Sequence, residues 1–160
     1  MRYRAPLLRY VRRTTVNSAD VEELVQEIWL AVIRGRERGP APARFVTYLF
    51  CIARRRCIDR WRRHGARVQA GQGDSPLEAL AAAVHTGPYP RAENEAMGAA
   101  MAGAIDALPL PQRETFLLRA ETDLTLEEIA QVTGTTRETA KSRLRYAFNR
   151  LRVVLEPWHE

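Results

Sequence analysis

The 160-residue chain has almost no lysine and very little cysteine, and each scarcity narrows what the protein can be. Lys141 is the only lysine among twenty-five basic residues, a bias that is typical of a GC-rich genome. The sequence has two cysteines, no secretory segment and no apolar run long enough to cross a bilayer. These absences predict a protein of the reducing cytoplasm that is not inserted in a membrane.

The two cysteines and the scarce histidines also argue against an enzyme or a metalloprotein. Cys51 and Cys57 are six positions apart on one expected helix, where they point about 120° away from each other and cannot form a disulfide. Adding His64 gives no spacing typical of structural zinc, so buried small side chains are the better interpretation. The sequence contains no Gly-rich phosphate loop and no cluster of histidines with acids. We therefore expect neither catalysis nor a cofactor.

Positive charge is concentrated in the first half of the chain. The net charge of +6 and the pI near 10.0 indicate a polyanionic partner. Residues 1–65 hold fifteen arginines against six acids, whereas the remainder of the chain is slightly acidic. The stretch 105–134 has only Arg113 and Arg119 against six acids.

Apolar periodicity predicts helices throughout, and no segment has a strand pattern. Three helices are expected over 4–16, 20–34 and 44–64, with Asp20 and Glu23 pairing as the cap of the second. Its core stripe repeats at three- and four-residue steps and comprises Val21, Leu24, Val25, Ile28, Trp29 and Val32. Four more helices are expected after a Gly- and Pro-rich connection that contains at most one short helical turn. The predicted fold is all-α, with two small helical domains at 1–65 and 92–158 joined by a flexible linker at 66–91.

The stretch from Leu124 to Leu151 has the pattern of a helix-turn-helix. Thr125 with Glu128, and Thr135 with Glu138, fit the capping box in which side chain and backbone satisfy each other at a helix start. Gly134 lies just before the second start, as a tight turn between two helices requires. The second helix then carries six cations against Glu138: Arg137, Lys141, Arg143, Arg145, Arg150 and Arg152. This concentration favours a helix that enters the DNA major groove, although a solvated basic face is the alternative.

The second and third expected helices present opposite charges. Residues 20–30 show an acidic face with one exposed leucine, which suits docking of a basic partner or is simply solvated. Arginines crowd the second half of the 44–64 helix beside Trp61, with Tyr48 and Phe50 upstream. Arginine with aromatic side chains is what unpaired nucleic acid requires, namely phosphate neutralisation and stacking. Asp59, three and four residues from Arg56 and Arg55, is interpreted as local charge relief.

Three segments together resemble the bacterial sigma-70 family, in its compact extracytoplasmic-function group. D-V-E-E-L-V-Q-E-I-W-L (20–30) is similar to the family's core-binding segment, and F-V-T-Y-L-F-C-I-A-R-R-R-C-I-D-R-W-R-R (45–63) to its promoter −10 segment. A-L-P-L-P-Q-R-E-T-F-L-L-R (107–119) and E-E-I-A-Q-V-T-G-T-T-R-E-T-A-K-S-R-L-R-Y-A (127–147) resemble the −35 domain. The segments have the family's order and spacing and cover roughly three quarters of the chain. Arg55 replaces an asparagine that the family associates with −10 base recognition, and Glu138 and Ala140 replace Gly and Val.

The resemblance implies a transcription initiation factor that binds core RNA polymerase, directs it to promoter DNA and helps open the strands. It implies a core-binding set made of Asp20, Glu22, Glu23, Gln26, Glu27 and Leu30. The implied −10 set is Tyr48, Arg54, Arg55, Arg56, Arg60, Trp61, Arg62 and Arg63. The implied −35 set is Thr136, Arg137, Glu138, Thr139, Lys141, Ser142, Arg143 and Arg145. An anti-sigma protein is a common further partner in the family.

A stand-alone DNA-binding regulator that uses only the helix-turn-helix is the alternative. It leaves the acidic face at 20–30 and the arginine-rich helix at 44–64 without a role.

Overall fold

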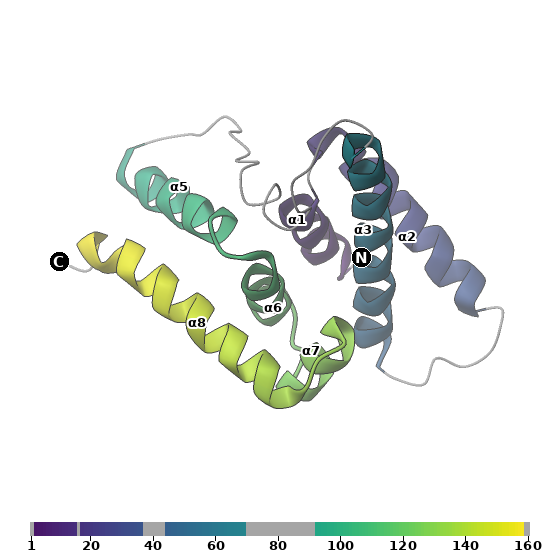
Figure 1. Cartoon of the computed structure of the whole chain (residues 1–160). Helices are drawn as coiled ribbons and strands as arrows, with labels where there is room; N and C mark the ends of the chain where they lie inside the picture. Colours follow the sequence, from purple (N-terminus) through teal and green to yellow (C-terminus); the bar gives the residue numbers. More distant parts are fainter. Residues whose placement is uncertain (1, 16, 37–43, 70–91, 159–160) are drawn as a thin grey trace.

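The computed structural model describes residues 2–15, 17–36, 44–69 and 92–158, and its regular structure is helical throughout these ranges (Figure 1). The elements are α1 (Arg4–Thr14), the 3-10 turn η1 (Ser18–Asp20), α2 (Val21–Arg36), α3 (Phe45–Gln69), α5 (Ala92–Asp106), α6 (Leu110–Glu121), α7 (Leu126–Thr133), α8 (Arg137–Leu155) and η3 (Glu156–Trp158). The all-α prediction is confirmed. Most of the predicted linker, including the expected short helical turn, lies outside the described residues.

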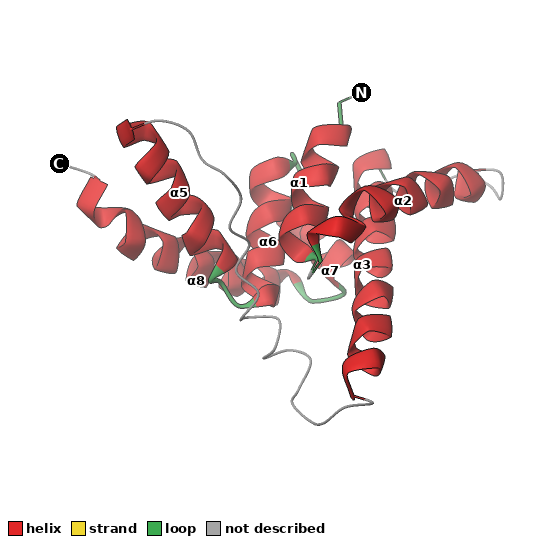
Figure 2. Ribbon diagram, turned by 90° about the horizontal axis from the view of Figure 1, so that it is seen from above, coloured by secondary structure: helices red, strands yellow, loops and turns green. Residues whose placement is uncertain are grey.

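Helices α1, α2 and α3 share one apolar core. Leu7 and Tyr10 of α1, Leu24 and Ile28 of α2, and Phe50 of α3 are almost completely buried. The expected α2 stripe is the buried face, with Trp29 packed at its margin. Three-and-four spacing produces this outcome because it places every apolar side chain on one side of the helix. Figures 1 and 2 show α2 and α3 together on one side of the molecule, with α1 between them and α6.

The start of α2 differs from the prediction. Asn17 caps η1 by accepting a hydrogen bond from the Ala19 amide at 3.1 Å. Asp20 already lies inside that turn, and an N-cap residue needs non-helical backbone. The expected Asp20–Glu23 cap is therefore wrong, and the Asp20 carboxylate instead contacts His64 of α3. Helix α3 runs past the expected end at His64, and Gly65 continues it.

Helix α6 links the two halves of the molecule. Residues 113–118 are buried on consecutive positions, so α6 is covered on more than one side. It packs against α1 on one side and α8 on the other, while α7 packs against the N-terminal end of α3 (Figure 1). The expected two domains are thus in contact with each other through the α1–α6 and α3–α7 pairs.

The helix-turn-helix prediction is confirmed in its first helix and its turn. Thr125 Oγ1 accepts from the Glu128 amide at 3.2 Å, and Glu128 Oε2 accepts from the Thr125 amide at 2.8 Å. Gly134 has φ of 65°, the left-handed conformation that favours glycine. The Thr135 amide donates to Ala130 O at 2.9 Å and completes a Schellman ending for α7.

The cap of α8 is displaced by one residue from the prediction. Thr136, not Thr135, is the N-cap, and its Oγ1 accepts from the Thr139 amide at 3.1 Å. Thr135 is unavailable because its own amide closes the preceding helix. Glu138 lacks the expected capping role, and its carboxylate accepts from Arg137 instead.

Replacing Thr136 by alanine is expected to lower the free energy of unfolding by about 1 kcal/mol, the usual value of an N-cap side chain. Thr135→Ala is the matched control and should cost clearly less, because the Thr135 side chain caps neither helix. Urea unfolding followed by circular dichroism measures both. Equal losses, or a larger loss for Thr135→Ala, would place the cap at the residue predicted from the sequence.

Candidate functional site

The outward face of α2 carries four of the six residues in the predicted core-binding set. Glu22, Glu23 and Gln26 are exposed, and Leu30 retains 50% of its surface. Ile33, which the sequence did not single out, is 55% exposed one turn further along. Carboxylates beside two accessible aliphatic side chains make an amphipathic surface suited to a basic, partly apolar partner. We call these five residues the α2 face.

The two remaining members, Asp20 and Glu27, turn toward α3 and hold Arg60. Arg60 donates to Glu27 at 2.9 Å and lies 3.5 Å from Glu23 and 3.8 Å from Asp20. Its side chain is only 14% exposed. His64 Nε2 lies 2.9 Å from Asp20 Oδ2. The structure thus joins one residue of the predicted −10 set to the predicted core-binding set, and Arg60 is already neutralised.

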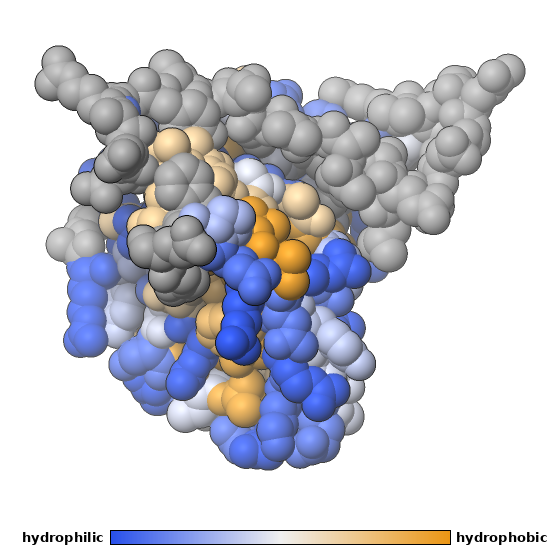
Figure 3. Space-filling view, turned by 90° about the vertical axis from the view of Figure 1, so that its left-hand side faces the viewer, coloured by the Kyte–Doolittle hydropathy of each residue, from blue (hydrophilic) through white to orange (hydrophobic). Residues whose placement is uncertain are grey.

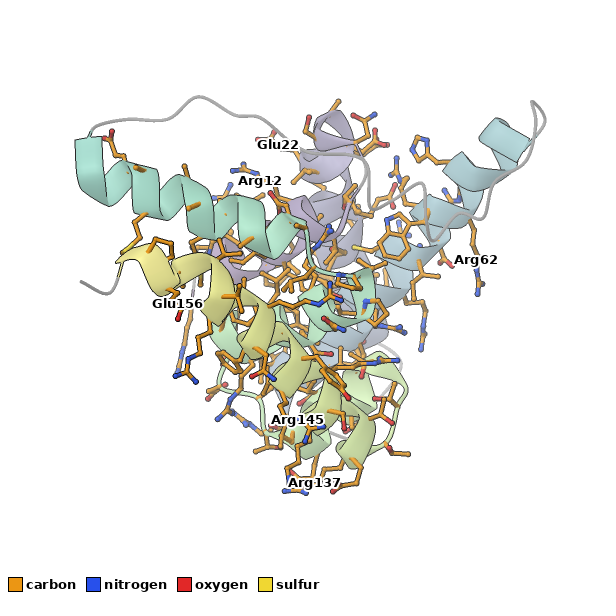
Figure 4. All side chains as sticks on the ribbon, turned by 60° about the vertical axis from the view of Figure 1, so that its left-hand side comes forward. Arg12, Glu22, Arg62, Arg137, Arg145 and Glu156 are labelled. Atoms are coloured by element: carbon orange, nitrogen blue, oxygen red, sulfur yellow. The ribbon has the colours of Figure 1, made fainter. Side chains whose placement is uncertain are left out.

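The rest of the predicted −10 set is spread around α3. Arg55, Arg62 and Arg63 are exposed and form no ion pair within the described part of the chain. Figure 4 shows Arg62 extending away from the body of the molecule on the C-terminal half of α3. Arg56 is half-buried. These side chains offer positive charge to a ligand that approaches the second half of α3 from solvent.

The aromatic side chains of α3 are less accessible than its arginines. Trp61 is half-buried, and its indole N–H has no acceptor among the described residues. Tyr48 places its hydroxyl against Gly35, where an added Cβ would lie 1.9 Å from the oxygen. Phe50 is fully buried in an edge-on contact with Tyr10, so it cannot stack on a base. Of the aromatic residues in the predicted −10 set, Tyr48 and Trp61 are both partly accessible as stacking surfaces.

Arg54 does not face solvent freely, because Glu114 of α6 binds it. Arg54 Nε donates to Glu114 Oε1 at 2.7 Å, and the buried Tyr10 hydroxyl donates to the same oxygen at 2.9 Å. The Glu114 side chain is 10% exposed. Burial raises the pKa of Glu114 above its ordinary value, although Arg54 and Tyr10 oppose the shift. One oxygen of the C-terminal half therefore joins α1, α3 and α6.

Sequence reasoning did not identify Arg113 or Glu114 as important residues. Arg113 is buried and donates to the carbonyl oxygens of Arg13, Asp106 and Leu108, at the C-terminal ends of α1 and α5. Burial lowers its pKa. The sequence did contain a signal for these two residues. Arg113 and Glu114 are adjacent charged residues at the start of a segment that is otherwise uncharged up to Leu118, and charged side chains that become buried need specific partners.

A second connection between the halves lies at the start of α3. Arg44 donates to Asp123 at 2.8 Å and to Glu128 at 3.1 Å, and Thr47 Oγ1 donates to Glu128 at 3.3 Å. The hydrogen bond from Arg44 holds the pKa of Asp123 below its ordinary value. The pKa of Glu128 is lowered chiefly by the Thr125 amide and further by Arg44. Glu128 thus caps α7 and also binds the N-terminal end of α3.

Helix α8 presents the predicted −35 set on more than one side. Thr136, Arg137, Glu138, Lys141 and Arg145 are exposed near its N-terminal end, where Figure 4 places Arg137 and Arg145 together at one tip of the molecule. The other three predicted residues, Thr139, Ser142 and Arg143, are half-buried.

One arginine of the −35 set has carboxylate partners within the protein, and a second lies near a buried carboxyl. Arg137 donates to Glu127 of α7 and to Glu138, so it connects the two helices of the motif. Arg143 lies close enough to Glu114 for its charge to lower the pKa of that carboxyl. Within the predicted −35 set, Lys141 and Arg145 are the exposed cations without a carboxylate partner among the described residues.

Neither cysteine has a reactive environment. Cys57 is buried against Thr14, and burial raises the pKa of its thiol to about 11. Burial also raises the pKa of Cys51, which is half-buried. Thiolates, not thiols, are the nucleophiles and metal ligands, so both cysteines act as small apolar side chains. The described residues contain no group of three or more His, Cys, Asp or Glu placed to hold a metal ion.

An apolar surface lies where the outer parts of α5 and α8 meet. Figure 3 looks onto this side and shows hydrophobic atoms among hydrophilic ones. Val153 and Val154 of α8 are exposed, and Met97 of α5 is 43% exposed. None of the described helices combines the length and apolarity that crossing a bilayer requires.

Comparisons with known proteins match both halves. The model of sigma-70 region 2 matches residues 1–67, and that of sigma-70 region 4 matches residues 104–153. The chain is 28% identical over 148 residues to the RNA polymerase sigma factor CarQ of Myxococcus xanthus, covering 91% of this chain and 80% of that protein. Its fold is similar to that of the sigma factor RpoE of Bartonella quintana, solved in complex with the anti-sigma factor NepR. That match has a TM-score of 0.72 at 23% identity and covers 94% of this chain and 89% of the other.

Proposed function

This chain belongs to the sigma-70 family of transcription initiation factors, in its extracytoplasmic-function group. We propose that three separate exposed surfaces of the chain bind the polymerase and the two promoter elements. The α2 face binds core RNA polymerase, α3 contacts the −10 element, and α8 enters the −35 major groove. The protein contributes binding specificity and catalyses no reaction of its own. It acts in the cytoplasm, together with the polymerase.

The α2 face supports the polymerase assignment. Its carboxylates and its two accessible aliphatic side chains lie on the side of α2 opposite the core stripe. Interfaces of this kind combine an apolar centre with charged groups that steer the partner. A stand-alone regulator needs no such surface, and the region 2 match over residues 1–67 does not favour that alternative.

The arginines of α3 support the −10 assignment. Arg55, Arg62 and Arg63 supply cations that form no ion pair with any other described residue, and Tyr48 and Trp61 offer limited stacking surface on the same helix. Single-stranded DNA is bound by this combination of backbone neutralisation and base stacking. Arg55 stands at the position where the family usually has asparagine, so we expect a −10 preference of its own.

The accessible end of α8 supports the −35 assignment and carries the proposal for the C-terminal half. Lys141 and Arg145 are one helical turn apart on an exposed face that starts directly after the helix-turn-helix turn. A recognition helix reads DNA through residues at this end. Each side chain that contacts a base edge contributes about 1–3 kcal/mol of discrimination.

An anti-sigma protein is a further proposed partner. Its support is the family resemblance and the solved relative, which is bound to one. A pull-down from native lysate that recovers polymerase and no other protein would count against it.

Transcription by purified core RNA polymerase tests the proposed function. Adding the protein to core polymerase and promoter DNA should produce discrete new start sites. Folded protein that neither binds core polymerase nor yields new starts would contradict the proposal.

A further inference from the structure

The exposed end of α8 carries one carboxylate among its cations. Glu138 is the second residue of α8 and the only acid in that helix, and its side chain is 76% exposed. A carboxylate on a surface that meets DNA repels the phosphates of the backbone and so lowers affinity. Contacts with the backbone alone therefore give no reason for an acid at this position.

Glu138 lies on the same side of α8 as the two cations proposed to contact the −35 element. Lys141 and Arg145 follow it at three and seven positions, spacings that place side chains on one helical face. All three side chains are exposed, whereas Ala140 and Ala147 on the opposite side are fully buried. The face that would enter the major groove thus begins with an acceptor and continues with donors.

The other polar side chains in the first turn of α8 are already engaged. Thr136 Oγ1 accepts from the Thr139 amide at 3.1 Å and lies 2.9 Å from Thr139 Oγ1. Arg137 donates to Glu127 of α7 and, at 3.2 Å, to Glu138 Oε1. Glu138 Oε2 has no partner among the described residues, and the contact with Arg137 restrains the carboxylate. This restraint lowers the entropy cost of binding a second donor.

The edges that the bases present in the major groove determine which of them can donate to a carboxylate. Guanine presents two acceptors, and thymine presents an acceptor beside a methyl group, so neither can donate to it. Adenine presents the N6 amino group, but its N7 acceptor lies next to that donor and repels a carboxylate. Cytosine presents the N4 amino group without an adjacent acceptor on the same base. Cytosine is therefore the base that fits the free oxygen of Glu138.

We propose that Glu138 is a specificity-determining residue, which selects cytosine at one position of the −35 element by accepting a hydrogen bond from the N4 amino group. The inference rests on the proposed entry of α8 into the −35 major groove. Lys141 and Arg145 have the complementary part, because they donate to guanine acceptors or to phosphates. The alternative is that Glu138 only stabilises the N-terminal end of α8 through the helix dipole, and this alternative predicts no base preference.

Transcription from a promoter library tests the inference with the full chain and core RNA polymerase. The library is one promoter identified by run-off transcription, randomised across its −35 element, and the unmodified chain should favour cytosine at one position. Glu138→Gln should change the preferred base there to adenine, because an amide accepts from N6 and donates to N7. The ratio of transcription from cytosine-bearing to adenine-bearing promoters should fall by about tenfold. Glu138→Ala should use the two about equally, and preferences at the other positions should remain.

Glu156→Gln is the matched control. It removes one exposed negative charge beyond the other end of α8, where Figure 4 places Glu156 well away from Arg137. It therefore changes the net charge by the same amount and should keep the cytosine preference. Folding should persist in Glu138→Gln, since the amide oxygen still accepts from Arg137.

Three results would overturn the proposal. The first is an unmodified chain that favours cytosine at no −35 position, and the second is a Glu138→Gln variant that ranks the four bases as the unmodified chain does. The third is a Glu138→Gln variant that loses affinity for core polymerase with its base ranking unchanged, which would identify the carboxylate as a contact with a basic protein surface. Absence of any new start site with the unmodified chain would instead contradict the proposed function itself, and this inference with it.

Discussion

Gln26→Arg/Leu30→Arg is expected to weaken binding to core RNA polymerase by about 100-fold, equivalent to about 2.7 kcal/mol. The two side chains are exposed one turn apart on α2, and neither has a hydrogen bond or ion pair among the described residues. Two added cations would cancel the two negative charges of the α2 face that attract a basic partner, and would remove an apolar contact at its centre. Folding should persist because nothing buried changes. Titration of labelled protein with core polymerase measures the loss.

A charge-matched control on another helix gives this result its meaning. Ala96→Arg/Gly103→Arg adds the same charge on the exposed side of α5, and a Cβ at Gly103 meets nothing within 4 Å. It should bind core polymerase as the unmodified chain does. Glu27 is unsuitable for this experiment because it holds Arg60. Unchanged affinity in Gln26→Arg/Leu30→Arg would show that the α2 face is an ordinary solvated surface.

Glu114→Ala is expected to lower the free energy of unfolding by about 3 kcal/mol, because it leaves two partners without an acceptor in a buried place. Tyr10 would lose the carboxylate that accepts its hydroxyl hydrogen bond, and Arg54 would lose the same carboxylate. Glu114→Gln is the matched control and should cost less than about 1 kcal/mol, since an amide oxygen still accepts from both. Urea unfolding measures both variants. Equal losses would mean that the charge, and not the acceptor oxygen, holds the halves together.

The pH dependence of the same carboxyl has a defined sign. Burial raises the pKa of Glu114 in the folded protein above its unfolded value. The folded state therefore takes up this proton more readily, and the resulting stability is fully present below the unfolded pKa and is lost as the pH rises through the folded pKa. Relative to Glu114→Gln, the unmodified chain should become more stable as the pH falls through that window. A difference that is independent of pH would contradict the raised pKa.

The elements that local sequence determines were predicted well. The Thr125–Glu128 box, the turn at Gly134 and the core stripe of α2 depend on residues within one or two helical turns of each other. The geometry of such local features can be predicted from the sequence because the interacting residues are close together in it. The N-cap of α8 was wrong by one residue because Thr135 fits the capping-box pattern with Glu138, whereas the true cap, Thr136, is followed three residues later by Thr139. The Schellman ending of α7, in which the Thr135 amide donates to Ala130 O, assigns Thr135 to the end of α7.

Contacts between the halves were beyond sequence reasoning. The pairing of Arg54 with Glu114 spans 60 positions, and that of Arg9 with Glu121 spans 112. Charge composition showed an acidic stretch and an arginine-rich stretch, yet nothing local indicates which carboxylate meets which arginine. For the same reason Asp20 and Glu27 were assigned to one surface and Arg60 to another, although the packing of α2 on α3 brings all three together.

Run-off transcription over a genomic promoter library, by purified core RNA polymerase with and without the protein, tests the central claim most directly. The account predicts discrete new start sites that share two sequence elements at a fixed separation. It further predicts that Lys141→Ala/Arg145→Ala relaxes the upstream element and leaves the downstream one unchanged. Folded protein that produces no new start and no binding to core polymerase would contradict the account.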